Sequence, residues 1–212
     1  MAAEKKTIKT DAYKEDVKLF NRWSFNGVIV ADDGLRPYIN LNPILVPKTN
    51  GYYHNTAFYK TKINVVERFM TRMQVVGHKN KKHKFSSGHN TGKSQRMMKE
   101  MVQILETLEQ KTKENPIQVL VTAIEKSAPR EEVITIERSG ARYAQAVDMG
   151  PQRRVDLVIR AMCQGAAQKS FGKSVTVVDA LTEEILNAYK GLESSVAIAK
   201  KNEIEKMAAA AK

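Results

Sequence analysis

Residues 127–165, SAPREEVITIERSGARYAQAVDMGPQRRVDLVIRAMCQG, decide the fold expected for this chain. Residues 133–136 are all β-branched, Ser139 and Gly140 are turn residues, and a second strand-like run extends over 142–147. Two such runs joined by a two-residue turn are typical of a β-hairpin, which we place at 131–149. Because a lone two-stranded ribbon is only marginally stable in water, we expect it to lean on a helical body or on a partner.

Arginines surround this hairpin at its base and near its tip. They are Arg130, Arg138, Arg142, Arg153 and Arg154, the last two directly after a Gly-Pro pair that opens the next helix. Guanidinium forks match the oxygens of phosphate groups, so the pattern predicts a basic arm that projects from the body into nucleic acid. Tyr143 either stacks on a base or makes a cross-strand contact within the hairpin, and the sequence leaves both open.

Elsewhere, apolar residues recur with the period of amphipathic helices. Such stretches begin near residues 61, 97, 116, 151, 178 and 196. Asn115-Pro116 and Pro151 are helix-start signals, and Gly191 is a helix stop. The predicted fold is therefore mainly α, a bundle of about six helices with a protruding two-stranded β-hairpin and an irregular N-terminal extension.

The first 60 residues lack the helical period. We expect residues 1–18 to be a flexible tail, residues 19–60 to be an irregular extension that lies along the body or a partner, and residues 61–212 to be a helical domain that binds nucleic acid. Within the extension, turn residues at Asp32, Asp33 and Gly34 separate two stretches. We expect a short strand over 25–30 and another extended piece over 35–41.

The charge balance points to a polyanionic partner. Lys and Arg number 35 against 23 Asp and Glu, a net charge of +12. Residues 78–96, HKNKKHKFSSGHNTGKSQR, contain six cations and no acid. An ordinary surface mixes the two signs, so we expect phosphate contacts from this loop. Its cations are Lys79, Lys81, Lys82, Lys84, Lys93 and Arg96.

Signals for an enzyme are weak. The segment 88–94, GHNTGKS, resembles a phosphate-binding loop, but only three residues separate its glycines and no apolar strand precedes it. His78, His83 and His89 lie among lysines without a cysteine or an acid, which does not suit a metal ion. We expect no catalytic residue, metal or other cofactor. A phosphotransferase stays as an alternative, and nucleotide turnover that disappears on changing Lys93 would support it.

The remaining features narrow the setting. The single cysteine, Cys163, excludes an intrachain disulfide and is expected to fill the core. No apolar run approaches the roughly 18 residues of a membrane span, so we expect a cytoplasmic protein without a membrane partner. A second alternative is a transcription factor, although no helix-turn-helix pattern is evident. A two-fold footprint on duplex DNA would support that alternative.

With these motifs placed, the chain resembles the small-ribosomal-subunit protein seven family in its archaeal and eukaryotic form. The matching segments are VVERFMTRMQVVG at 65–77, NTGK at 90–93, ENPIQVLVTAIEKSAPREE at 114–132, AVDMGPQRRVDLVIRAMCQGA at 146–166 and KKNEIEKMA at 200–208. Together they cover most of residues 60–208 in the family's order.

This resemblance implies a structural constituent of the small ribosomal subunit. Such a protein binds the 3′ major domain of the rRNA, nucleates assembly of the subunit head, and lies near the exit-site tRNA and the messenger path. Its other expected partners are neighbouring head and platform proteins, and it is not an obligate homo-oligomer. Carried over by position, the RNA-facing parts are the 78–96 loop, Arg130, the pair Arg153-Arg154, and a hairpin tip with Arg138, Arg142 and Tyr143.

Overall fold

The structure is a computed structural model that describes residues 17–77 and 90–212. Within these ranges it holds a short 3₁₀ helix, seven α-helices and two strands, in the order η1 Arg36–Tyr38, α1 Tyr59–Lys62, α2 Val65–Gln74, α3 Ser94–Thr112, α4 Pro116–Ser127, β1 Glu131–Arg138, β2 Ala141–Asp148, α5 Pro151–Ser170, α6 Val177–Lys190 and α7 Val196–Ala210. The predicted mainly helical fold is confirmed. The six predicted helices correspond to α2–α7, and α1 is a single additional turn.

The helix boundaries follow from local capping. The side chain of Asn115 accepts a hydrogen bond from the backbone N–H of Ile117, and Pro116 occupies the first turn of α4. Thr176 caps α6 through the N–H of Asp179. Gly191 ends α6 with φ of 75°, a conformation that glycine adopts without steric cost.

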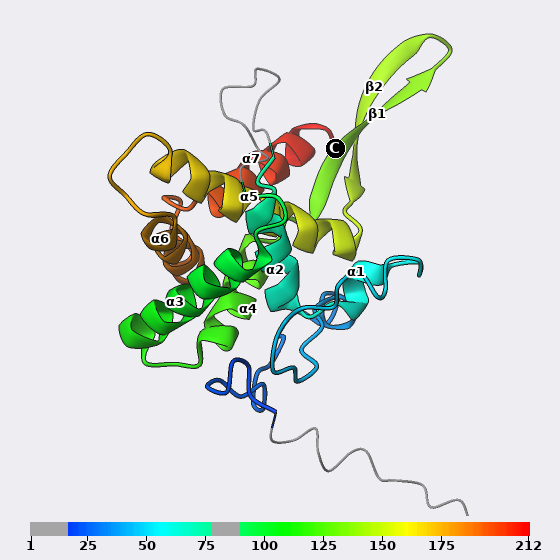
Figure 1. Cartoon of the computed structure of the whole chain (residues 1–212). Helices are drawn as coiled ribbons and strands as arrows, with labels where there is room; N and C mark the ends of the chain where they lie inside the picture. The colour runs from blue at the N-terminus through cyan, green and yellow to red at the C-terminus, as the bar shows by residue number, and fades with distance from the viewer. Residues whose placement is uncertain (1–16, 78–89) are drawn as a thin grey trace, which may run out of the picture.

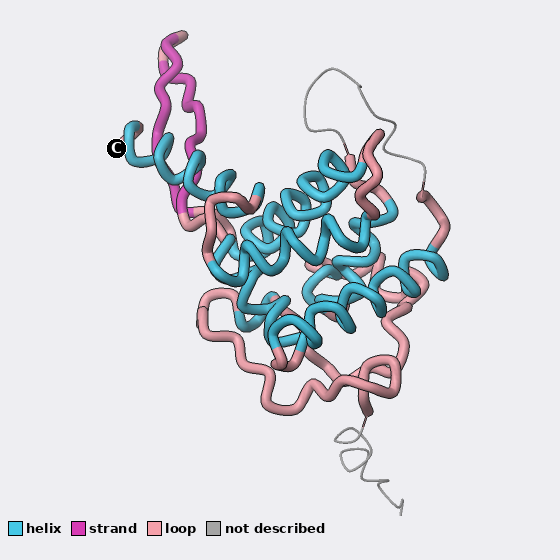
Figure 2. The backbone as a smooth tube through the Cα atoms, turned by 90° about the vertical axis from the view of Figure 1, so that its left-hand side faces the viewer, coloured by secondary structure: helices cyan, strands magenta, loops and turns pink. Residues whose placement is uncertain are grey.

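A single apolar cluster lies between the helices, which pack around one another in Figures 1 and 2. Its largest fully buried side chains include Phe69, Met97, Met101, Leu105, Leu120 and Met162. Cys163 is buried among them, and burial raises the pKa of its thiol to about 12. The prediction of a core cysteine is confirmed. No described helix is long and apolar enough to cross a membrane.

The hairpin projects from this body as a two-stranded antiparallel sheet (Figure 2). The pairing runs from Glu131 opposite Asp148 to Arg138 opposite Ala141. Ser139 and Gly140 have φ of 52° and 79°, and two positive φ values are what the tight turn of a two-residue hairpin requires. The predicted hairpin is confirmed. Helix α7 packs against its base, mainly along β1.

The structure of the extension differs from the prediction. Residues 25–30 form no strand because a glutamine takes the place of a partner strand: Gln118 of α4 accepts the N–H of Ile29 at 2.8 Å and donates to its carbonyl at 3.1 Å. Residues 35–38 are not extended either; the backbone becomes extended only at Ile39, and Asn40 then forms an isolated bridge with Asn64. The carbonyl of Asp32 accepts the N–H groups of Leu35 and Arg36, which starts a tight turn that η1 continues.

The extension contributes to the core cluster. Its buried apolar side chains are Leu19, Trp23, Phe25, Val30, Leu35 and Ile39. Trp23 also donates its indole N–H to Glu109 of α3 at 2.9 Å. The described extension therefore lies along the helical body. Most of the predicted tail, residues 1–16, falls outside the described residues, and the boundary at residue 60 stays a prediction.

Candidate nucleic-acid interface

The hairpin tip presents a cation and an aromatic ring to solvent. The side chain of Arg142 is 77% exposed and lies 3.6 Å from Glu137, an exposed pair that contributes little to stability. Tyr143 is 59% exposed and lies opposite Ile136 in the register. The cross-strand position and the exposed ring occur together, so Tyr143 can meet a partner without leaving the hairpin. Arg138 pairs with Ala141 through its backbone.

Helix α7 holds one side of the hairpin base. The carboxylate of Glu205 accepts the backbone N–H of Arg130 at 3.1 Å. At the end of the chain, Lys212 pairs with Glu131 at 2.7 Å. The base is thus tied to the C-terminal helix, while Arg130 itself is exposed.

Helix α5 holds the other side through two adjacent arginines with different surroundings. The side chain of Arg153 is 64% exposed and pairs with Glu132 of β1 at 2.9 Å. The side chain of Arg154 is only 11% exposed. Its guanidinium donates to the carbonyl of Pro129 and to the carboxylate of Asp32, each at 2.9 Å. Arg154 therefore joins the start of the hairpin, α5 and the N-terminal extension.

The turn at Asp32 is also bound to α4. Glu125 accepts the N–H groups of Ala31 at 2.6 Å and Asp32 at 3.1 Å. Partial burial alone would raise the pKa of Asp32, but the hydrogen bond and charge of Arg154, together with hydrogen bonds from the backbone N–H groups of Gly34 and Leu35, outweigh it and lower that pKa below its ordinary value. Because the hairpin leaves the end of α4 and returns at the start of α5, this turn fastens both of its connections.

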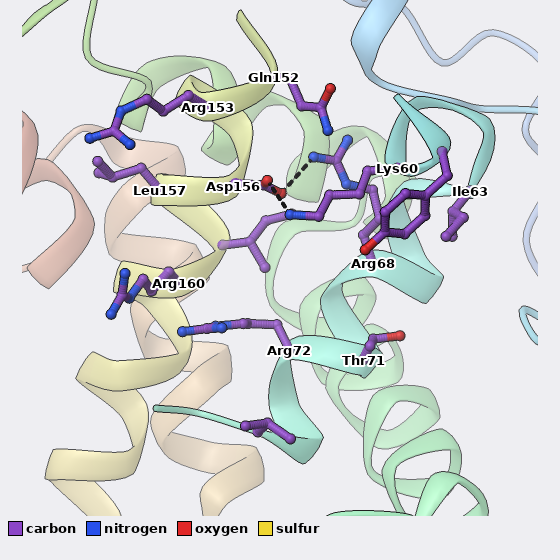
Figure 3. A pocket seen from close by; sticks show the side chains of 13 residues that line it. Lys60, Ile63, Arg68, Thr71, Arg72, Gln152, Arg153, Asp156, Leu157 and Arg160 are labelled. Carbon is purple, nitrogen blue, oxygen red and sulfur yellow. Dashed lines mark hydrogen bonds and ion pairs between the residues drawn. The ribbon is translucent and has the colours of Figure 1, made fainter. Parts of the chain in front are cut away.

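A basic pocket of about 740 Å³ opens between α1, α2 and α5 (Figure 3). On one side of it, Lys60 and Arg68 converge on Asp156 at 2.6 Å and 2.9 Å. Asp156 is the only acid among the residues that line the pocket, against five cations from the described chain. The cations are Lys60, Arg68, Arg72, Arg153 and Arg160. The wall of the pocket therefore carries excess positive charge.

In Figure 3, the side chain of Arg72 on α2 extends towards Arg160 on α5. Within the described ranges, neither arginine makes an ion pair. One terminal nitrogen of Arg72 donates to the carbonyl of Val76 at 3.0 Å, whereas its buried Nε has no hydrogen-bond partner. Burial, and then the positive charge of Arg160, lower the pKa of Arg72 below its ordinary value. Guanidinium groups stay charged in proteins, so the pocket holds two cations whose mutual repulsion an anion would relieve.

Comparison with known proteins identifies the family of this chain. The family model of ribosomal protein S7p/S5e matches residues 35–212. The chain belongs to this family. The chain is similar to the small ribosomal subunit protein uS7 of Nanoarchaeum equitans, with 49% identity over 92% of this chain and 99% of the relative. The corresponding protein of Methanococcus maripaludis strain C6 is 36% identical over 93% of this chain and 100% of its own length.

Membership in the S7p/S5e family makes the chain a structural component of the small ribosomal subunit and not an enzyme. The family predicted from the sequence is thereby confirmed. In the part of the chain that the structure describes, no group of three or more His, Cys, Asp and Glu side chains is placed to hold a metal ion.

The cationic loop of this family member is described only in part. Lys79, Lys81, Lys82 and Lys84 lie outside the described residues. Lys93 precedes α3 and is exposed. Arg96, also exposed, pairs with Glu100 one turn later at 2.8 Å. RNA contact by these residues stays a prediction.

The sequence analysis missed Arg72 and Arg160, although a signal for both exists. Arg68 and Arg72 are four residues apart on α2, while Arg153 and Arg160 are seven apart on α5. Both spacings place side chains on one face of a helix. Reading the polar faces of the helices, besides the apolar ones, would have marked two basic stripes. That the stripes face one another depends on packing.

Proposed function

We propose that this protein binds the 3′ major domain of small-subunit rRNA, the RNA of the subunit head, and nucleates assembly of that head. The observation that carries the proposal is the pocket between α2 and α5, where Arg72 and Arg160 lie near each other and neither makes an ion pair in the described residues. Folded proteins rarely hold buried or facing charges without partners. A backbone phosphate of RNA is the anion that membership in a ribosomal family makes available.

The chemistry of binding follows from guanidinium and phosphate. A guanidinium group can donate two parallel hydrogen bonds to phosphate oxygens, and each such contact releases condensed counterions from the RNA. The deep, narrow major groove of A-form RNA does not admit side chains, so preference for one RNA comes from its shape. A rigid wall of two packed helices supports this kind of recognition because it keeps the distances between its cations constant.

The hairpin would provide a second contact, at a distance from the pocket. Its tip carries Arg138, Arg142 and Tyr143, and the exposed ring of Tyr143 can stack on an unpaired base. We place this tip near the exit-site tRNA and the messenger path, and we expect neighbouring head and platform proteins to contact other faces in the cytoplasmic ribosome. Such a protein is not an obligate homo-oligomer.

The predicted contact residues do not contribute equally to this proposal. Lys93, Arg96, Arg130 and Arg153 are exposed and retain the ability to reach a phosphate. Arg154 uses its guanidinium on Asp32 and Pro129, so we assign it the role of positioning the hairpin and not of contacting RNA.

The test is equilibrium binding of the full chain to an RNA fragment that spans the 3′ major domain, compared with an unrelated structured RNA of equal length. Affinity for both falls as salt is raised, because counterion release weakens. We expect the preference for the head fragment to persist at high salt. Equal affinities that fall together would reduce the protein to a general polyanion binder and contradict the proposal.

A further inference from the structure

The segment just before the basic pocket gathers aromatic rings at the surface. Tyr52 and Phe58 are 81% and 69% exposed. Tyr53 meets Tyr52 edge to face at 5.1 Å between centroids, and His54 meets Tyr59 at 4.7 Å. We call residues 52–59 the aromatic ridge. In Figure 1 it turns out from the body beside α1 (cyan).

The ridge is supported by its own turns and not by the core. The N–H groups of Tyr52, His54 and Thr56 donate to carbonyls three residues earlier, and none of the residues 52–59 is buried. Phe58 has φ of 54°, a left-handed conformation that is strained for a bulky residue. Its exposed ring gains no burial to offset that strain. Rings held outward in this way do not contribute to the hydrophobic core.

Two cavities with basic linings include residues of the ridge or next to it. Tyr59 and Lys60 line the pocket between α2 and α5. Tyr53 and Lys62 line a second cavity of about 440 Å³. No acid occurs between Asp33 and Glu67, a stretch that carries Arg36, Lys48, Lys60 and Lys62. Stacking rings between cations match an unpaired nucleic-acid strand, in which bases and phosphates alternate.

We infer that the aromatic ridge binds an unpaired segment of RNA, with Tyr52 and Phe58 stacking on bases while the exposed Lys62 contacts a neighbouring phosphate. This inference rests on the proposed function and specifies the RNA chemistry that the extension recognises. An acidic or apolar protein partner fits less well. The former would not need the rings, and the latter would be disfavoured by the lysines that border them.

The test uses the full chain and two short synthetic strands, an unstructured oligouridylate and a strand of equal length with the same backbone but without bases. Stacking predicts at least about fivefold tighter binding of the strand with bases. The double variant Tyr52→Ala/Phe58→Ala loses this preference, while Tyr52→Phe/Phe58→Tyr keeps it. Ile29→Ala, which removes another exposed apolar side chain of the extension, leaves the preference unchanged.

A second readout reports on stacking itself. Tyr52→Trp places an indole on the ridge, and its fluorescence is expected to be quenched by oligouridylate but not by the strand without bases. Trp23 contributes little to such a change because it is buried and bound to Glu109. Circular dichroism verifies that each variant is folded.

Two results would overturn the inference. One is equal affinity of the wild-type chain for the two strands. The other is an unchanged preference in Tyr52→Ala/Phe58→Ala, including the case in which that variant instead loses binding to a neighbouring ribosomal protein. Either result leaves binding of the head fragment unaffected, so failure of this inference is distinguishable from failure of the proposed function.

Discussion

The hairpin base and the pocket between α2 and α5 both gather cations, but these cations differ in whether they pair with an acid. At the base, Arg153, Arg154 and Lys212 each pair with a carboxylate from another segment. In the pocket, Arg72 and Arg160 have no such partner within the described residues. A cluster of arginines in the sequence therefore does not reveal its role. The position of the acids in the fold does.

Arg154 should cause the largest loss of stability among the cations of the base. Arg154→Ala leaves the carboxylate of Asp32 and the carbonyl of Pro129 without their donor. We expect the free energy of unfolding in urea to fall by about 2–3 kcal/mol. Arg153→Ala is a matched control because its exposed pair contributes at most about 1 kcal/mol. Equal losses in the two variants would contradict the positioning role of Arg154.

A substitution at the hairpin tip should affect RNA binding more than stability. Arg142→Ala removes an exposed pair with Glu137, so the free energy of unfolding should change by less than about 0.5 kcal/mol. If the tip reaches RNA, the free energy of binding to a ribosomal RNA complex that includes the tip contact becomes less favourable by about 1–2 kcal/mol, because a charge-assisted hydrogen bond is lost. Ala141→Ser, at the neighbouring position, should change neither quantity. A stability loss as large as that of Arg154→Ala would mean that the tip also holds the fold.

Low pH should destabilise the base of the hairpin through protonation of Asp32. Its pKa in the folded state is below its ordinary value, so its contribution to stability is complete above that ordinary value and is lost as the pH falls through the lowered one. Unfolding measured from neutral pH down to about pH 3 should therefore show a steeper decline in the wild-type chain than in Asp32→Asn. Parallel declines would show that Asp32 and Arg154 are not coupled.

The smallest expected effect concerns Glu132, which occupies the guanidinium of Arg153. Glu132→Gln removes a negative charge near the proposed RNA and frees Arg153 for a phosphate. We expect affinity for the head fragment to rise about two- to threefold at low salt, and the gain to vanish at high salt. Affinity that falls instead would mean that Arg153 needs Glu132 to be held in place.

Local signals in the sequence were sufficient for most of the fold. The cap at Asn115, the stop at Gly191 and the Ser139-Gly140 turn act within a few residues, so their structures could be predicted without knowing the rest of the chain. The apolar period likewise marked the buried faces of the helices, because burial depends on the repeat of side chains around each helix.

Long-range partners could not be predicted in the same way. Gln118 replaces a strand partner of Ile29 across 89 positions, and Asp32 meets Arg154 across 122. No local pattern encodes such pairs. Arg154 was therefore predicted as an RNA contact from its sequence neighbours, and Arg72 and Arg160 were missed although each lies on a recognisable basic face.

The salt dependence of RNA binding by Arg72→Met/Arg160→Met shows whether the pocket between α2 and α5 contacts phosphates. Methionine keeps the packing of the aliphatic stem but removes the charge. We expect the slope of log affinity against log salt to fall by about 2 in magnitude, with the free energy of unfolding changed by less than about 1 kcal/mol. The control Arg22→Met/Lys200→Met removes two exposed cations that are paired with Glu106 and Glu203. It should keep the wild-type slope. Equal slopes for the two double variants, or unfolding of the pocket variant, would contradict the account.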